Sequence, residues 1–219
     1  MAFTLKTGLK NSFIILPSDQ SQVYLELLLK HEDREQLIQA VEQSFENDYL
    51  KSLYSEHPDN IDLSSCKFTI LDQFGENHRL TGGNSPKVPL DDESQMGGNP
   101  ANQFDTLYYA IKLQSSDGKT DQVVGGLEIY GDSECAELGL FIGKKHARKG
   151  YGTQAVQLAI KFLTTETGTE RIKWECDSNN LASIGVALKC GFKLDEQSFE
   201  IYKGRSGSLL YWVMENPPR

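Results

Sequence analysis

The sequence predicts an α/β fold, in which one mixed sheet carries helices on its faces. Its second half contains three closely spaced apolar segments, 107–113, 123–130 and 135–142. Asp-Gly and Gly-Asp turns separate these segments, and this pattern is typical of antiparallel hairpins. Helical and strand-like periodicities then alternate towards the C-terminus. Together these observations favour a sheet that is covered by helices.

The first half of the chain contains one predicted strand and one predicted helix. Apolar residues run from Tyr24 to Leu29, and Asp33 stands where the cap of a helix is expected. The segment after Asp33 has apolar residues at helical spacing, namely Leu37, Ile38, Val41 and Phe45. We therefore predict the order strand, cap, helix for this region.

A long segment after this helix lacks periodicity. From about residue 55 to residue 106 only the strand-like piece Phe68 to Leu71 stands out, while glycine and proline become frequent. Such a segment is typical of a long loop or insertion. A chain of 219 residues can bury one sizeable core. We therefore predict a single domain over residues 1–219, with an irregular insertion at about 55–106.

Downstream of segment 135–142, the pattern predicts turn, helix, strand, helix and two final strands. The first helix has an apolar face made of Ala155, Leu158, Ala159, Phe162 and Leu163. The strand after it alternates buried and polar positions, with Ile172, Trp174 and Cys176 on the buried face. The second helix carries the stripe Leu181, Ile184 and Leu188.

Composition limits the classes of partner. The net charge of −9 argues against nucleic-acid binding, because contacts with the phosphate backbone depend on Lys and Arg. The same charge favours a cationic partner or simply maintains solubility, and both interpretations stay open. The 4 cysteines show no paired short spacing, so no metal site is predicted. Without an apolar run of roughly 18 residues or a leader, we expect a cytoplasmic protein that does not contact membranes.

The segment from Gly143 to Gly152 joins a predicted strand to a predicted helix and has the properties of an anion site. Free backbone amides at a helix N-terminus attract anions. Gly150 and Gly152 would let a phosphate approach the main chain closely. Positive charge comes from Lys144, Lys145, Arg148 and Lys149. A surface turn with solvated lysines is the alternative that this segment alone leaves open.

Two other phosphate motifs fit this turn poorly. A Walker A loop needs Lys and then Ser or Thr directly after its last glycine, whereas Tyr151 follows Gly150. A dinucleotide fingerprint needs a further small residue three positions beyond its second glycine, and Ala155 satisfies this spacing. However, the preceding segments form predicted antiparallel hairpins and no βαβ unit opens the chain.

Three short motifs occur together in the second half. Residues 136–142 lead into 148–155, a strand followed by a glycine-bearing turn. Glu170-Arg171-Ile172 opens the strand after the helix. Asn180, Ser183, Lys189, Gly191 and Phe192 follow the spacing Asn-x2-Ser-x5-Lys-x-Gly-Phe. From about residue 107 to residue 194, the chain therefore resembles the GNAT superfamily of N-acetyltransferases, especially its branch of ribosomal-protein N-terminal acetyltransferases.

The resemblance implies a mostly antiparallel sheet whose central pair of strands splays apart, with helices on both faces. It also implies that acetyl-CoA binds as co-substrate, with its pantetheine arm beside the first of these strands and its phosphates at the turn. The implied binding residues are Leu140, Phe141, Ile142, Arg148, Lys149, Gly150, Tyr151, Gly152, Thr153, Asn180 and Lys189. For Lys189, contact with the adenosine phosphate and plain solvation remain equal alternatives. Ala147 stands where many members have Gln or Arg, so a side-chain contact is in doubt there.

The resemblance also implies a mechanism, in which a neutral amine attacks the thioester and a backbone amide near Phe141 holds the oxyanion. Glu137 is the candidate base, with substrate binding or solvent exposure as the alternative. Ser183 is the candidate acid for the thiolate, with helix capping as the alternative. No metal is implied.

The implied acceptor is an amine, and the sequence does not choose among a protein N-terminus, a lysine, a polyamine and an aminoglycoside. The competing hypothesis is a module without catalysis that binds acetyl-CoA as a sensor or holds a partner protein on the same fold. A homodimer is left open.

Overall fold

The structure, a computed structural model, describes part of the chain. The described residues are 3–4, 14–15, 21–27, 31–46, 103–104, 106–113, 121–132, 134–201, 208–215 and 217. The strand-like piece predicted at Phe68 to Leu71, with the predicted insertion up to residue 102, lies outside them.

The described strands form one 8-stranded sheet with the order β2-β3-β5-β6-β7-β8-β10-β9. Their bounds are β2 (Ile14–Ile15), β3 (Val23–Leu27), β5 (Thr106–Leu113), β6 (Gln122–Gly131), β7 (Cys135–Ile142), β8 (Arg171–Asp177), β9 (Lys193–Ile201) and β10 (Ser208–Glu215). β7 and β8 are parallel, and the other neighbours are antiparallel. A separate short ladder joins β1 (Phe3–Thr4) to β4 (Gln103–Phe104). The predicted mixed, mostly antiparallel sheet is confirmed.

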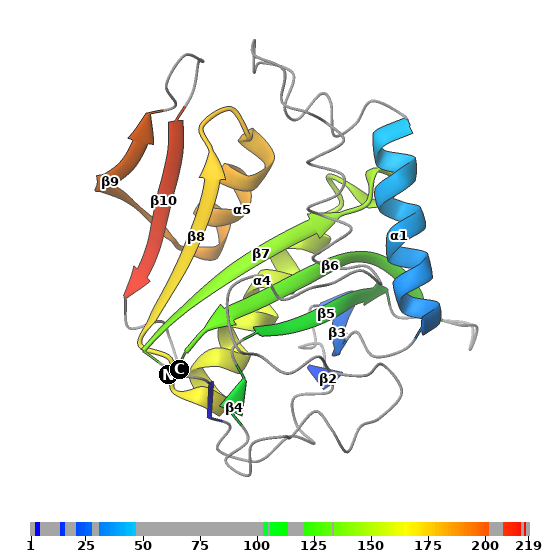
Figure 1. Cartoon of the computed structure of the whole chain (residues 1–219), viewed down its shortest axis with the longest axis horizontal. Helices are drawn as coiled ribbons and strands as arrows, with labels where there is room; N and C mark the ends of the chain where they lie inside the picture. Colours follow the sequence, from blue (N-terminus) through cyan, green and yellow to red (C-terminus); the bar gives the residue numbers. More distant parts are fainter. Residues whose placement is uncertain are drawn as a thin grey trace.

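The helices lie on both faces of this sheet (Figure 1). They are α1 (His31–Glu46), α4 (Tyr151–Phe162), which continues as a π-turn η3 (Leu163–Thr167), and α5 (Leu181–Cys190). On β5, the Tyr109 ring meets Phe162 of α4 edge to face at 6.4 Å, whereas Lys112 binds Asp33 of α1. Because side chains alternate along a strand, α1 and α4 cover opposite faces, called here the α1 face and the α4 face.

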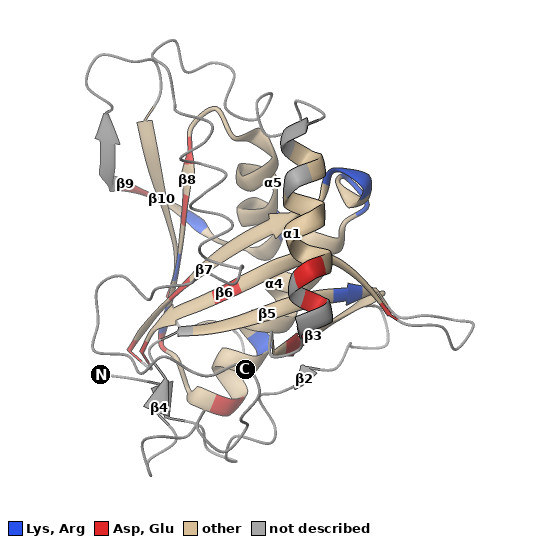
Figure 2. Cartoon of the chain, turned by 45° about the vertical axis from the view of Figure 1, so that its right-hand side comes forward, with Lys and Arg blue, Asp and Glu red and all other residues tan. Residues whose placement is uncertain are grey.

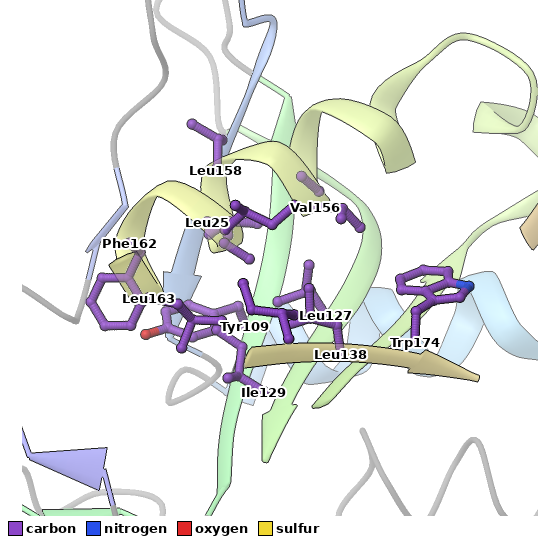
Figure 3. Packing of buried hydrophobic residues seen from close by; sticks show 14 of the residues in the cluster. Leu25, Tyr109, Leu127, Ile129, Leu138, Val156, Leu158, Phe162, Leu163 and Trp174 are labelled. Atoms are coloured by element: carbon purple, nitrogen blue, oxygen red, sulfur yellow. The ribbon is translucent and has the colours of Figure 1, made fainter. Parts of the chain in front are cut away.

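The main core lies between α4 and the sheet (Figure 3). Sheet residues Leu25, Tyr109 and Leu127 are fully buried against this helix. From α4, Val156 and Phe162 face them. Each such apolar side chain contributes roughly 1.5–3 kcal/mol on burial. This packing fixes the start of α4 relative to β7, which is where the predicted anion site lies.

A buried ion cluster attaches α1 to its face of the sheet. Lys112 Nζ lies 2.8 Å from Glu26 Oε2 and 2.8 Å from Asp33 Oδ1. The helix begins at His31 rather than after Asp33, so Asp33 is within the first turn. The predicted cap at Asp33 is therefore wrong, because this carboxylate forms an ion pair with Lys112 on the sheet beneath the helix. Leu37 and Val41 are buried as predicted, and the side chain of Phe45 lies outside the described residues.

β7 and β8 separate after a short paired stretch. Only Cys135 to Glu137 of β7 has partners on β8, namely Arg171 to Lys173. Beyond this point the two strands diverge, as Figure 1 shows between the green and yellow arrows. The predicted splay of the central pair is confirmed.

Candidate functional site

β7 and β8 leave a gap between them where they diverge. The edge of β7 that faces this gap carries polar backbone groups. Gly143 N donates to Val124 O over 3.0 Å, and this register continues through the pair Phe141 with Gly126. Since amides alternate between the two sides of a strand, Phe141 points its N–H to β6. Leu140 and Ile142 point theirs towards β8, and within the described residues no strand pairs with them there. The amides suited to hold a ligand are thus those beside Phe141, not that of Phe141 itself.

The turn after β7 presents the start of α4 to the same gap. It runs through a short 3-10 turn, η2 (Lys144–His146), and reaches α4 with Gly150 as N-cap. Arg148 and Gly150 have positive φ angles of 63° and 85°. A left-handed backbone conformation costs free energy for residues other than glycine, and residues that adopt it are concentrated at binding sites. None of the described side chains caps the helix, so its first amides are available to an anion.

Gly152 lets α4 start directly against β7. A Cβ atom at this position would lie 3.0 Å from Leu140 Cδ2 and 3.3 Å from Ile142 Cγ1. Gly152 is buried, and Thr153 and Arg148 are partly or fully exposed. The glycine therefore brings the first helical amides close to the free edge of β7. Tyr151, in contrast, is buried against the core and does not face the gap freely.

Asn180 caps α5 at the end of the gap nearest to the turn after β8. Its Oδ1 accepts a hydrogen bond of 3.0 Å from Ser183 N. Ser183 Oγ accepts one of 3.0 Å from Trp174 Nε1, so its hydroxyl is held over the α4 face. The alternative that Ser183 caps α5 is wrong, because Asn180 does so.

Lys189 lies close to the turn although it is at the other end of α5. It is exposed, and its neighbour Cys190 donates its Sγ hydrogen to Thr153 O at 3.7 Å. This contact places the last turn of α5 beside the first turn of α4. The burial of the Cys190 thiol raises its pKa to about 12.

Glu137 is the last residue of β7 that pairs with β8. It lies on the α1 face, because its neighbour Leu138 packs against the α4 side. Burial raises the pKa of Glu137 above its ordinary value, while a hydrogen bond donated by the Tyr130 hydroxyl and the charge of Lys173 oppose this rise. A half-buried carboxylate at the point where the strands part can accept a proton from a group in the gap.

Glu128 is a second carboxylate on the α1 face that the sequence analysis did not single out. It is 8% exposed, and its Oε2 lies where a Cβ at Gly139 would be only 3.1 Å away. Burial raises the pKa of Glu128, a hydrogen bond with Tyr108 lowers it, and the charge of Glu137 raises it. The signal in the sequence was one acidic residue within the otherwise apolar strand 123–130. Glu128 and Glu137 thus make this wall acidic.

We expect Glu128→Gln to stabilise the protein at neutral pH. The folded state binds a proton on Glu128 more readily than the unfolded state does, so its ionisation costs stability as pH rises through the raised pKa. The amide removes this cost and can still accept from Tyr108. Thermal unfolding should show a melting temperature a few degrees higher at pH 7.

The difference should shrink as pH falls below 4.5, where Glu128 becomes protonated in the unfolded state as well as in the folded state. An equal shift at both pH values would contradict this account. Glu170→Gln, at an exposed position before β8, is the matched control and should leave the melting temperature unchanged.

Apart from Tyr151, which is buried in the core, the predicted binding residues lie on the elements around one gap. The two predicted catalytic residues approach this gap from different sides. Glu137 lies on the α1 face. Ser183 lies on the opposite face, held by Trp174, which follows the Glu137 partner Lys173 on β8. A group bound between β7 and β8 would therefore have Glu137 on one side and Ser183 on the other.

The described ranges lack two other features that would bear on function. No group of three or more His, Cys, Asp or Glu in them is arranged to hold a metal ion. None of the helices there combines the length and the apolar character needed to cross a membrane.

The sequence matches a known family model and one curated relative. Residues 88–193 match the model described as the acetyltransferase (GNAT) domain. The uncharacterized N-acetyltransferase YjdG of Bacillus subtilis (strain 168) is 34% identical over 82 residues, which are 36% of this chain and 49% of that protein. The chain therefore matches about half the length of this relative.

Solved structures share the fold at low sequence identity. A protein of Vibrio cholerae assigned as a ribosomal-protein-serine acetyltransferase has a TM-score of 0.56 at 18% identity, over 93% of this chain and 97% of that one. A microcin self-immunity acetyltransferase in complex with acetyl-CoA and AMP has a TM-score of 0.54 at 18% identity, over 90% and 93%. A ribosomal alpha-N-protein acetyltransferase in complex with coenzyme A has a TM-score of 0.58 at 14% identity, over 92% and 97%.

Proposed function

Residues 88–193 of this chain carry an acetyltransferase domain of the GNAT family, and from this premise we propose that the protein transfers the acetyl group of acetyl-CoA to a primary amine. The gap between β7 and β8 is the observation that carries the proposal. It offers an unpaired strand edge of the right polarity for the amide-bearing pantetheine arm. It ends at an uncapped helix N-terminus suited to the pyrophosphate.

The binding residues in this proposal act mainly through their backbone. The edge from Leu140 to Ile142 takes the pantetheine arm, with Phe141 between the two amides that face the gap. The segment Arg148 to Thr153 takes the phosphates through its amides. Asn180 supplies its side chain from the start of α5. Lys189 directly precedes Cys190, which contacts Thr153, and this supports a contact between Lys189 and a phosphate of the adenosine end.

The proposed reaction is direct transfer in a ternary complex. The amine nitrogen forms a bond to the acetyl carbon and the bond from that carbon to sulfur breaks. Glu137 accepts the proton that the amine loses, directly or through one water. An amide of Leu140 or Ile142 stabilises the charge on the carbonyl oxygen. Ser183 donates a hydrogen bond to the departing thiolate.

The acceptor is proposed only as a class of amines. A protein N-terminus, a lysine, a polyamine and an aminoglycoside all present an ammonium group before reaction. The carboxylates of Glu128 and Glu137 on the α1 face are suited to bind it. We also propose that the whole chain forms one domain, because the described strands on both sides of residues 55–102 join a single sheet.

The test is calorimetric titration with acetyl-CoA, coenzyme A, ATP and NAD. We expect acetyl-CoA and coenzyme A to bind and Gly150→Glu to weaken both at least tenfold, because a carboxylate at a helix N-terminus repels phosphate. Gly150→Asn is the matched control, since Asn tolerates the φ angle of 85° without adding charge. Binding of ATP or NAD in place of acetyl-CoA would overturn the proposal.

The competing function is a binding module without catalysis. It predicts tight binding of acetyl-CoA without thiol release in the presence of any amine tested. Replacement of Glu137 separates the two, because a sensor has no use for a base at that position.

A further inference from the structure

A cavity of about 430 Å³ lies between α1 and the basic turn after β7. It is built from residues that the proposed reaction does not use. Its lining consists of Gln36, Gln39, Ala40, Gln43 and Ser44 of α1, Gln122 and Val123 of β6, and Gly143, Lys144, Lys145 and His146 of the turn. The cavity is therefore separate from the start of α4, which residues 150–153 form.

One wall is a row of glutamine amides on α1. Gln36, Gln39 and Gln43 follow the spacing that places side chains on one face of a helix. The oxygen of the Gln36 amide accepts a 3.2 Å hydrogen bond from Val123 N. Its NH2 group is therefore the part of this amide that remains for a ligand. The wall can donate hydrogen bonds without carrying charge.

The opposite wall is the basic turn, which packs tightly on α1. Ser44 is fully buried, and its Oγ donates to Ala40 O over 2.7 Å and accepts from Lys144 N over 3.1 Å. A Cβ at Gly143 would lie 3.2 Å from Ala40 Cβ, so the glycine permits this close approach. These contacts hold the two walls at a fixed separation.

The cavity is electropositive. The described residues of its lining include two lysines and no Asp or Glu. His146 is half-buried, and burial together with the charges of Lys149 and Lys145 lowers its pKa, so its ring is neutral at pH 7. Figure 2 shows the basic residues of this turn gathered beside the end of α1. Donor groups without a carboxylate are the lining that an oxyanion requires.

We propose that this cavity binds a phosphate or carboxylate group of a ligand that is bound at the same time as the thioester, an inference that rests on the proposed transferase function. The cavity lies on the α1 face, where Glu137 also lies. From Glu137 to Gly143 the strand spans about 20 Å. The oxyanion therefore belongs to a remote part of a long acceptor, since the adenosine end of coenzyme A is proposed to lie beside the last turn of α5.

The test follows the His146 ring by NMR while inorganic phosphate is titrated into two complexes, one saturated with coenzyme A and one with dephospho-coenzyme A. A shift in both complexes means that the cavity stays open beside coenzyme A and serves the acceptor. A shift only with dephospho-coenzyme A would mean that the 3′-phosphate of coenzyme A fills the cavity, and this would overturn its assignment to the acceptor. No shift in either complex would overturn the proposal.

Two variants make the test specific to the cavity. We expect Lys145→Glu and Gln39→Glu each to weaken phosphate binding at least tenfold, because each adds a carboxylate to one wall. Lys161→Glu, in the last turn of α4, is the matched control and should bind phosphate as the unaltered chain does. A shift that survives Lys145→Glu would contradict the proposed site. Failure of coenzyme A itself to bind, measured by calorimetry, would instead count against the transferase function.

Discussion

Glu137→Gln is expected to lower kcat for acetyl transfer by about 100- to 10,000-fold, which is the range for loss of a general base. The affinity for acetyl-CoA should stay within about twofold, because Gln has the same shape and can still accept from Tyr130. Steady-state kinetics with a saturating amine, together with calorimetry, separate the two quantities. Normal turnover in this variant would show that the base is another group or water.

The pH profile gives an independent test of this role. Glu137 acts as a base only when ionised, and burial raises its pKa above 4.5 against the hydrogen bond from Tyr130 and the charge of Lys173. Activity should therefore fall as pH falls through this raised pKa, and Glu137→Gln should lack this limb. Lys173→Met removes the neighbouring positive charge, so it should move the limb to higher pH.

The profile also distinguishes a base from a structural carboxylate. Protonation of the amine itself lowers the rate at acidic pH, but that effect persists in Glu137→Gln and does not respond to Lys173→Met. If Lys173→Met left the acidic limb in place, the group titrating there would not be Glu137.

The elements of the second half could be predicted because their signals are local. Period-two alternation at Ile172, Trp174 and Cys176 and glycine turns between hairpin strands depend only on neighbouring residues. The start of α4 after Gly150 could also be predicted, since a glycine turn before an amphipathic helix is a continuous stretch of sequence. The structure places these elements where the periodicity put them, but the stripe predicted on α5 is not a buried face, because Leu181 and Leu188 are exposed.

The polar residues buried between distant strands could not be predicted. Lys112 pairs with Glu26, which lies 86 positions earlier in the chain. That both side chains are largely buried becomes evident only once β3 and β5 are paired in the sheet. The same holds for Glu128, whose burial depends on Gly139 of the next strand. The prediction of a cap at Asp33 was wrong for the same reason, because a carboxylate can either cap a helix or form an ion pair with a buried lysine.

The separation of β7 from β8 had no signal in local periodicity. Residues 138–142 and 174–177 have the pattern of ordinary paired strands, and only the family resemblance implied that they part. Physically, the divergence depends on α4 and α5 filling the α4 face on either side of the gap. That is a property of packing among elements that are far apart in the chain.

Gly152→Val is expected to weaken acetyl-CoA binding by about 100-fold or more. Its side chain would meet Leu140 and Ile142, whose atoms already lie 3.0 and 3.3 Å from a Cβ at this position. To relieve the contact, the start of α4 must move away from β7 and carry its amides with it. Two hydrogen bonds to a charged group contribute about 3 kcal/mol or more, which corresponds to at least 100-fold in affinity.

Loss of folding would give the same result, so stability needs its own control. Overpacking of this kind costs about 1–3 kcal/mol, which circular dichroism and thermal unfolding would detect as a lower melting temperature in a folded protein. Gly185→Val is the matched control for a side chain added to a helical glycine. Apart from the helix's own backbone and the two chain neighbours, no described atom lies within 4 Å of a Cβ there, so its melting temperature should be unchanged or higher.

A second substitution tests whether displacement of α4 is the cause. Leu140→Ala removes the methyl groups that the new valine would meet first, so the double variant should regain part of the lost affinity while Leu140→Ala alone gains none. Recovery by this route requires that the helix returns to β7, because the phosphate contacts come from its backbone. If Gly152→Val folds and binds acetyl-CoA normally, the amides at the start of α4 do not carry the binding.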